Sequence, residues 1–269
     1  MNLDSLKLRE HHRESVANLI RLLEQDESFR AIILSGSIAQ GVARDDSDID
    51  VYLVVTDEEF QKRKRDHSLC YYDKDVCTYP EGYIDGKIIN YAFLESALER
   101  GSEPTRASFI GSRAVFSRIP GIDSLLQQIP VYPEVNREQN LKDFYAQVLL
   151  YGKYFAARAL DQNNPYLLSQ SLSNVVLFAG RLILAYNRIL FPCHKSFMRA
   201  VEGAPDKPVQ YVQQVHELLA DPTKERMLEF VETIGSFQDW GITYHQAVSL
   251  FVANNEWNWI DAPPPLQDR

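Results

Sequence analysis

Two aspartates, Asp48 and Asp50, stand two positions apart at the start of the apolar run Val51–Val55. The run predicts a β-strand over residues 48–55, in which residues i and i+2 point to the same face. At ~3.3 Å per residue, the two carboxylates lie ~6–7 Å apart. Two acidic groups this close repel each other unless a cation lies between them, and Mg²⁺ or Mn²⁺ prefers such oxygen ligands. The pair therefore predicts a divalent metal site suited to phosphoryl transfer.

A second feature, Gly36-Ser37, follows the apolar run 31–34 and precedes a predicted short helix over residues 38–42. Backbone N–H groups at such a turn and helix start attract phosphate. Gly36 would let a phosphate approach the backbone, and the Ser37 hydroxyl adds a donor. Gly41 would permit tight packing or a positive φ angle where the chain turns back.

The full pattern, Gly36-Ser37-x3-Gly41-x5-Ser47-Asp48-Ile49-Asp50, resembles the signature of the polymerase-beta-like nucleotidyltransferase superfamily. The C-terminal half resembles, in architecture, the substrate-side domain of antibiotic nucleotidyltransferases of the kanamycin and streptomycin type. The resemblance implies that Gly36 and Ser37 hold the triphosphate, and Ser47 of the same motif is a further candidate for nucleotide binding. It also implies that Asp48 and Asp50 are catalytic metal ligands.

The superfamily usually adds a third carboxylate on the next strand. We interpret residues 83–94 as a hairpin with its turn at Asp85-Gly86 and its second strand over residues 87–94. This interpretation puts Asn90 where the third acid is expected, and an amide cannot act as a base. The nearest acids are Asp85 and Glu95, of which we choose Asp85 as the catalytic candidate. The remaining possibility is that no protein base exists.

The elements that position these residues change character along the chain. A helix is predicted over residues 5–28, and strands over 31–34, 48–55, 87–94 and 112–117. After Asn136 the pattern is helical, with helices expected at about 137–161, 166–190, 208–220, 223–237 and 243–254. The proline-rich segment 120–133 separates the two parts. We therefore predict an α+β protein with a small mixed-sheet nucleotidyltransferase domain at 1–132 and an all-helical, substrate-side domain at 133–269.

Composition restricts the class of partner. The chain of 269 residues has a formal net charge of −9, so nucleic acid is an unfavourable partner. Its longest apolar stretch is interrupted by Arg181 and Arg188, which argues against a membrane span. Three cysteines without a metal-ligand spacing, and a start without a signal-peptide pattern, favour a cytoplasmic protein.

The function expected from these features is metal-dependent transfer of a nucleoside monophosphate. The donor would be a nucleoside triphosphate, with ATP as the expected one, and Mg²⁺ or Mn²⁺ as the metal. The acceptor would be a hydroxyl of a small molecule, with an aminoglycoside-like compound as a candidate. The alternatives are a toxin–antitoxin-type protein nucleotidyltransferase and a catalytically impaired nucleotide-binding protein.

Overall fold

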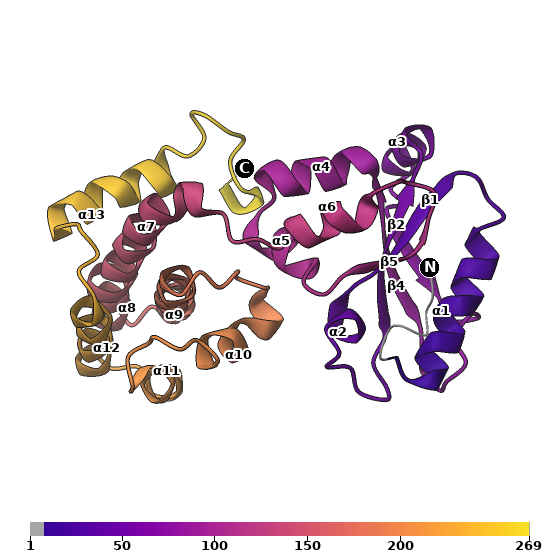
Figure 1. Ribbon diagram of the computed structural model, residues 1–269. Coiled ribbons are helices and arrows are strands. Elements are labelled where there is room, and N and C mark those ends of the chain that lie inside the picture. The colour runs from indigo at the N-terminus through magenta and orange to yellow at the C-terminus, as the bar shows by residue number, and fades with distance from the viewer. Residues whose placement is uncertain (1–7, 269) are drawn as a thin grey trace. The chain divides into compact units, whose positions relative to one another are not determined.

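The computed structural model describes residues 8–268 and divides into two compact units, the first ending at Tyr132 and the second beginning at Pro133. Figure 1 shows a sheet with helices in the first unit and helices in the second. The predicted α+β fold class is confirmed.

The first unit is built on a five-stranded mixed sheet with the order β3-β4-β2-β1-β5. The central strands β2 and β4 are parallel, and all other neighbours are antiparallel. Antiparallel and parallel pairs in one sheet match the predicted mixed sheet. The strands are β1 (Phe29–Leu34), β2 (Ile49–Val55), β3 (Cys70–Asp73), β4 (Ile84–Asn90) and β5 (Arg113–Ser117).

Helices cover both faces of this sheet, because each strand in the centre is apolar on both sides (Figure 1). On one face, α1 (Glu10–Leu23) buries Val16 and Leu19 against β1 and β2. On the other face, α4 (Tyr91–Arg100) and α6 (Ile122–Gln128) pack over Val54 and Ile89. The remaining helices of this unit are α2 (Gly36–Ala39), α3 (Asp57–Arg65) and α5 (Glu103–Ser108).

The second unit has only helical elements in its described residues, as predicted. Its core helix α9 (Pro165–Tyr186) begins at the N-cap Asn164, whose side chain accepts a hydrogen bond from the N–H of Leu167. The other helices are α7 (Arg137–Leu149), α8 (Ala156–Asp161), α10 (Phe197–Glu202), α11 (Tyr211–Ala220), α12 (Lys224–Phe237) and α13 (Tyr244–Phe251). A π-helical segment, Leu150–Phe155, joins α7 to α8.

By length and composition α9 is long and apolar enough to cross a membrane, and it alone among the described helices passes that test. Ten of its residues are buried in the core of the second unit, including Val175, Leu182 and Ile183. A core helix surrounded by other helices is expected to be this apolar.

Candidate active site

Three carboxylates meet at one end of the central strands. Asp50 in β2 is paired directly with Asp85 in β4, and Asp48 lies one residue before β2. One oxygen atom from each of these aspartates lies within 4.8 Å of the other two. All three side chains are partly exposed, so a ligand can reach them. The chain thus gathers two neighbouring acids and one distant acid at a single place.

The predicted turn at Asp85-Gly86 is wrong, because both residues lie inside β4. Gly86 is paired with Val51 on one side and with Tyr71 on the other. A Cβ atom at residue 86 would lie 2.8 Å from the Cβ atom of Tyr71, so this glycine permits close approach of β3 to β4. The strand, rather than a turn, places Asp85 beside Asp50.

Asn90 lies at the opposite end of β4 and does not belong to the acidic cluster. It is the N-cap of α4, where its Oδ1 atom accepts a hydrogen bond of 3.1 Å from the N–H of Phe93. Its Nδ2 atom donates to Asp57 Oδ1 at 2.7 Å. Glu95 is exposed on α4 and also lies outside the cluster. The interpretation that put Asn90 at the third-acid position is therefore wrong.

The Gly-Ser turn lies against the same cluster. Gly36 starts the short helix α2 with a φ angle of +65°, and a Cβ atom there would lie 2.6 Å from Asp50 Cγ. The N–H of Ser35 donates to the carbonyl oxygen of Asp50 at 2.9 Å, which ties the turn to β2. The Ser37 hydroxyl, half-buried in α2, makes no hydrogen bond within the described part of the chain. The positive φ expected for Gly41 is confirmed at +73°.

Ser47 has a local role in the loop that leads into Asp48. Its Oγ atom accepts a hydrogen bond of 2.9 Å from the N–H of Arg44, and its carbonyl oxygen accepts one of 2.7 Å from the Tyr79 hydroxyl. His11 Nε2 donates to the carbonyl oxygen of Asp45 at 3.1 Å. These bonds attach the loop to α1 and to Tyr79, and so fix the approach to β2.

A buried histidine, His12, packs against His11 and Tyr79, the two residues that bond this loop. His12 is 1% exposed, and its ring packs edge-on against His11 and Tyr79 at centroid distances of 4.2 and 5.1 Å. Burial, followed by the electrostatic effect of the neighbouring His11 imidazole, lowers the pKa of His12 below its usual value. The neutral imidazole is therefore the form that fits this packing.

Three further side chains share the sheet face of the acidic cluster and were not predicted as site residues from the sequence. The Tyr83 hydroxyl donates to Asp48 Oδ2 at 3.1 Å, and Tyr72 of β3 is the cross-strand partner of Asp85. Lys87 is paired with Tyr52, and its Nζ atom lies 5.5 Å from the centre of that ring. The signal was present in the alternation of residues 83, 85 and 87, which share one face only if the segment is a continuous strand.

The negative charge of Asp48 and its hydrogen bond to Tyr83 raise the pKa of the Tyr83 hydroxyl above its usual value. Tyr83 therefore remains a protonated donor at neutral pH. Its bond restrains Asp48 on the side that faces β4.

The three carboxylates fit a divalent cation. Ligands bonded to Mg²⁺ at 2.0–2.1 Å lie about 3 Å apart when adjacent and about 4 Å apart when opposite. The separation of up to 4.8 Å between the oxygens of Asp48, Asp50 and Asp85 is close to this spacing. An all-oxygen donor set suits Mg²⁺ or Mn²⁺ better than a soft metal. These residues would hold the ion.

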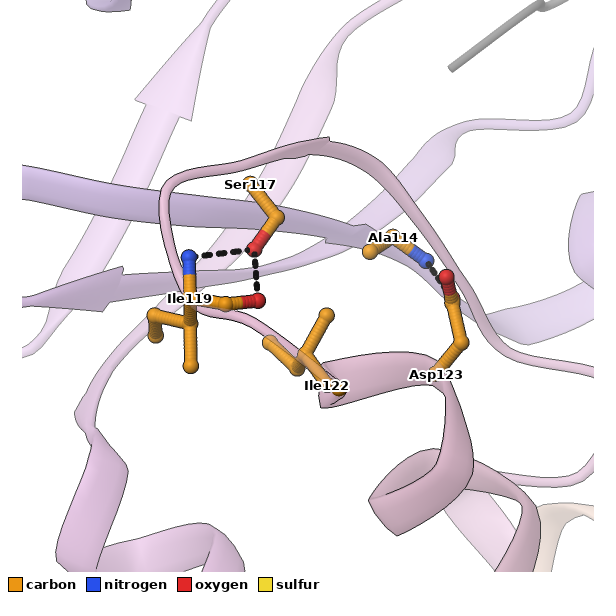
Figure 2. A pocket seen from close by; sticks show the side chains of 6 residues that line it. Ala114, Ser117, Ile119, Ile122 and Asp123 are labelled. Carbon is orange, nitrogen blue, oxygen red and sulfur yellow. Dashed lines mark hydrogen bonds between the residues drawn. The ribbon is translucent and has the colours of Figure 1, made fainter.

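The first unit also has a pocket of about 330 Å³ away from the acidic cluster, between β5 and α6 (Figure 2). Figure 2 shows that its polar atoms are engaged in holding the connecting loop. The Ser117 hydroxyl bonds the N–H and the carbonyl oxygen of Ile119, and Asp123 accepts from the N–H of Ala114. We assign no chemistry to this pocket. It is lined by Ala114, Ser117, Ile119, Gly121, Ile122 and Asp123.

Together, the mixed sheet, the Gly-Ser turn and the three carboxylates define a domain with a cation-attracting site beside a glycine turn and helix start. Comparison with known proteins identifies the class. Residues 16–101 match the family model of the nucleotidyltransferase domain, and this segment includes all the candidate site residues. This match identifies a nucleotidyltransferase domain within the first unit and supports the polymerase-beta-like superfamily.

One similar solved structure is a nucleotidyltransferase-like protein from Exiguobacterium sibiricum 255-15, with a TM-score of 0.50 and 9% sequence identity. The similarity covers 95% of this chain and 79% of that chain. At this identity it supports the fold alone. A search of curated proteins finds no match. The domain family supports transfer of nucleoside monophosphates in general.

Proposed function

We propose that the protein is a metal-dependent nucleotidyltransferase that moves a nucleoside monophosphate from a nucleoside triphosphate, with ATP as the expected donor, onto a hydroxyl of a small molecule. The observation that carries this proposal is the meeting of Asp48, Asp50 and Asp85 within 4.8 Å of one another beside the Gly-Ser turn. An aminoglycoside-like compound is the first acceptor to test. The free cysteines and the net charge of −9 support a cytoplasmic protein that does not use nucleic acid as its acceptor.

In this proposal Asp48 and Asp50 are the metal ligands, and Asp85 completes the set and acts as the catalytic base. A bound divalent cation would neutralise the carboxylates and polarise the α-phosphate for attack. The backbone N–H groups at Gly36 and Ser37 begin a helix and have no partner within it. They and the Ser37 hydroxyl hold the triphosphate, while Ser47 shapes the loop that presents Asp48.

The chemical step is an in-line displacement. The acceptor hydroxyl oxygen attacks the α-phosphorus and forms a new P–O bond, while the bond from the α-phosphorus to the bridging oxygen breaks and pyrophosphate leaves with that electron pair. Asp85 takes the proton from the acceptor hydroxyl. Because β4 places Asp85 beside Asp50, and Asn90 lies at the other end of the strand, a carboxylate is available to act as the base.

The experiment is an assay with ATP labelled at the α-phosphate, Mg²⁺ or Mn²⁺, and a panel of aminoglycosides and other polyhydroxylated amines. The expected result is labelled acceptor together with pyrophosphate, lost in excess chelator and in the Asp85→Asn variant. Label that appears on a protein would support the toxin–antitoxin alternative instead. Absence of metal-dependent triphosphate binding would contradict the nucleotidyltransferase assignment.

A further inference from the structure

The acidic cluster is bordered on its β3 side by a pair of tyrosine rings. Tyr72 is paired across the strands with Asp85, and Tyr83 is bonded to Asp48. The ring centroids of Tyr72 and Tyr83 are 5.2 Å apart, with an angle of 35° between the planes. The two rings therefore form one aromatic surface that is continuous with the carboxylates.

The two rings differ in how they are held. Tyr83 is fixed by its hydrogen bond to Asp48, whereas Tyr72 has a relative exposure of 63% and leans on Tyr83. An aromatic ring held in place from one side and open on the other is preorganised for stacking, because little side-chain freedom is lost when a planar ligand binds. β3 is an edge strand, so no described strand pairs with it on the side away from β4.

We propose that Tyr72 stacks on the base of the nucleoside triphosphate, supported from behind by Tyr83; this rests on the proposed nucleotidyltransferase function. The required ligand carries a flat base one ribose away from its α-phosphate. Directly opposed residues on neighbouring antiparallel strands have Cβ atoms ~4.5–5.5 Å apart, so Tyr72 begins that close to Asp85. Phosphate at the carboxylates and base on Tyr72 is thus a consistent arrangement.

This arrangement also bears on nucleotide choice. Stacking on an aromatic ring tolerates different bases, because every base has a π-face. Asn90 carries the one amide side chain among the described residues of β3 and β4, and it lies at the far end of β4, bonded to Asp57, so no amide of these strands lies beside Tyr72 to read a base edge. The protein therefore accepts purine triphosphates of both kinds, with ATP and GTP bound to within a few-fold of each other.

The test compares two probes that share a triphosphate and differ in the base. Calorimetry in Mg²⁺ measures binding of α,β-methylene ATP and of inorganic tripolyphosphate to the full chain and to its Tyr72→Ala, Tyr72→Phe and Tyr91→Ala variants. Tyr91 is a matched control, since it is 40% exposed but follows the far end of β4. Thermal melting confirms that each variant is folded.

The expected result is that Tyr72→Ala weakens binding of the ATP analogue by about 5-fold to 150-fold. Tripolyphosphate binding stays unchanged, and Tyr72→Phe and Tyr91→Ala behave as the unmodified protein. Equal weakening of both probes, or no weakening of either, would overturn the stacking role while leaving the transferase assignment intact. If Tyr72→Ala lowers turnover only through the acceptor's KM, the ring contacts the acceptor and the inference is wrong. If the unmodified protein binds neither probe, the proposed function fails first.

Discussion

The carboxylate of Asp50 occupies the space in which a side chain at residue 36 would begin. A Cβ atom on Gly36 would lie 2.6 Å from Asp50 Cγ, and the φ angle of +65° already disfavours other residues. The residue that shapes the turn, Gly36, and the proposed metal ligand, Asp50, therefore depend on each other.

Gly36→Ala is accordingly expected to displace the Asp50 carboxylate and to lower kcat/KM about a hundredfold, since small misplacements of catalytic groups cost that much. Gly41→Ala is the matched control, because Gly41 has a φ angle of +73° but nothing within 4 Å of a Cβ atom. Steady-state kinetics on both variants distinguish the contact with Asp50 from general backbone strain. Similar losses in the two would show that the contact has no special effect.

Asp48→Ala and Asp50→Ala are each expected to abolish transfer while the protein remains folded. Each removes a proposed metal ligand and also reduces repulsion within the cluster, so the melting temperature without metal should hold or rise slightly. Asp46→Asn, in the same loop and in an exposed ion pair with Arg44, should keep near-normal turnover. Full activity in either alanine variant would contradict the metal-site assignment.

Substitutions of Asp85 and Asn90, near the two ends of β4, should have different effects: the first on turnover and the second on stability. Asp85→Asn should lower turnover by orders of magnitude with little effect on folding. Asn90→Asp should leave the metal site alone but replace a donor to Asp57 with a second carboxylate, destabilising the fold by about 1.5–3 kcal/mol. Thermal unfolding and turnover measured on both variants test this. A rise in metal affinity in Asn90→Asp would contradict the observed placement.

Ser37→Ala should weaken triphosphate binding in the presence of Mg²⁺ by roughly tenfold or more. A hydrogen bond to a charged group contributes ~1.5–3 kcal/mol, and the Ser37 hydroxyl is not used elsewhere in the described structure. Ser47→Ala is an informative comparison, since Ser47 Oγ accepts from Arg44 and its loss should act mainly by loosening the loop. Equal binding with and without chelator would rule out the metal-dependent geometry.

Stability should fall as the pH is lowered from 7.5 to 5.5. Burial depresses the pKa of His12 in the folded state, so the unfolded chain takes up a proton near pH 6.5 while the folded chain resists it. One such proton changes the free energy of unfolding by at most about 1.4 kcal/mol per pH unit. His12→Gln should flatten this dependence in calorimetry, and the exposed His245→Gln should not. An unchanged slope in His12→Gln would remove His12 as its source.

Sequence reasoning succeeded where the signal was local. The spacing of Asp48 and Asp50 and the apolar run after them fix a strand with both acids on one face, and the mixed-sheet and helical parts follow from their periodicity. The Gly-Ser turn was located correctly, although its helix begins at Gly36 rather than residue 38.

It failed where a local preference was overruled by pairing between distant segments. Asp-Gly is a favoured turn pair, yet Gly86 lies inside β4, where its lack of a side chain lets the paired residue Tyr71 of β3 approach closely. The short edge strand Cys70–Asp73 was not predicted, and without it nothing in the sequence indicates why β4 should continue through Asp85. The aromatic surface formed by Tyr72 and Tyr83 also depends on the pairing of β3 with β4.

The parallel register of β2 and β4 makes ion binding depend on the alignment of these two strands. Residues 51–84 lie between Asp50 and Asp85, so the three-carboxylate cluster does not exist in any single segment of the unfolded chain. A slip of one residue between these strands would turn Asp85 to the opposite face. A cation that needs all three acids binds only the correctly aligned sheet and stabilises it by mass action. Magnesium would then favour one strand register over the others that the chain can sample, because it would bind and stabilise only that register.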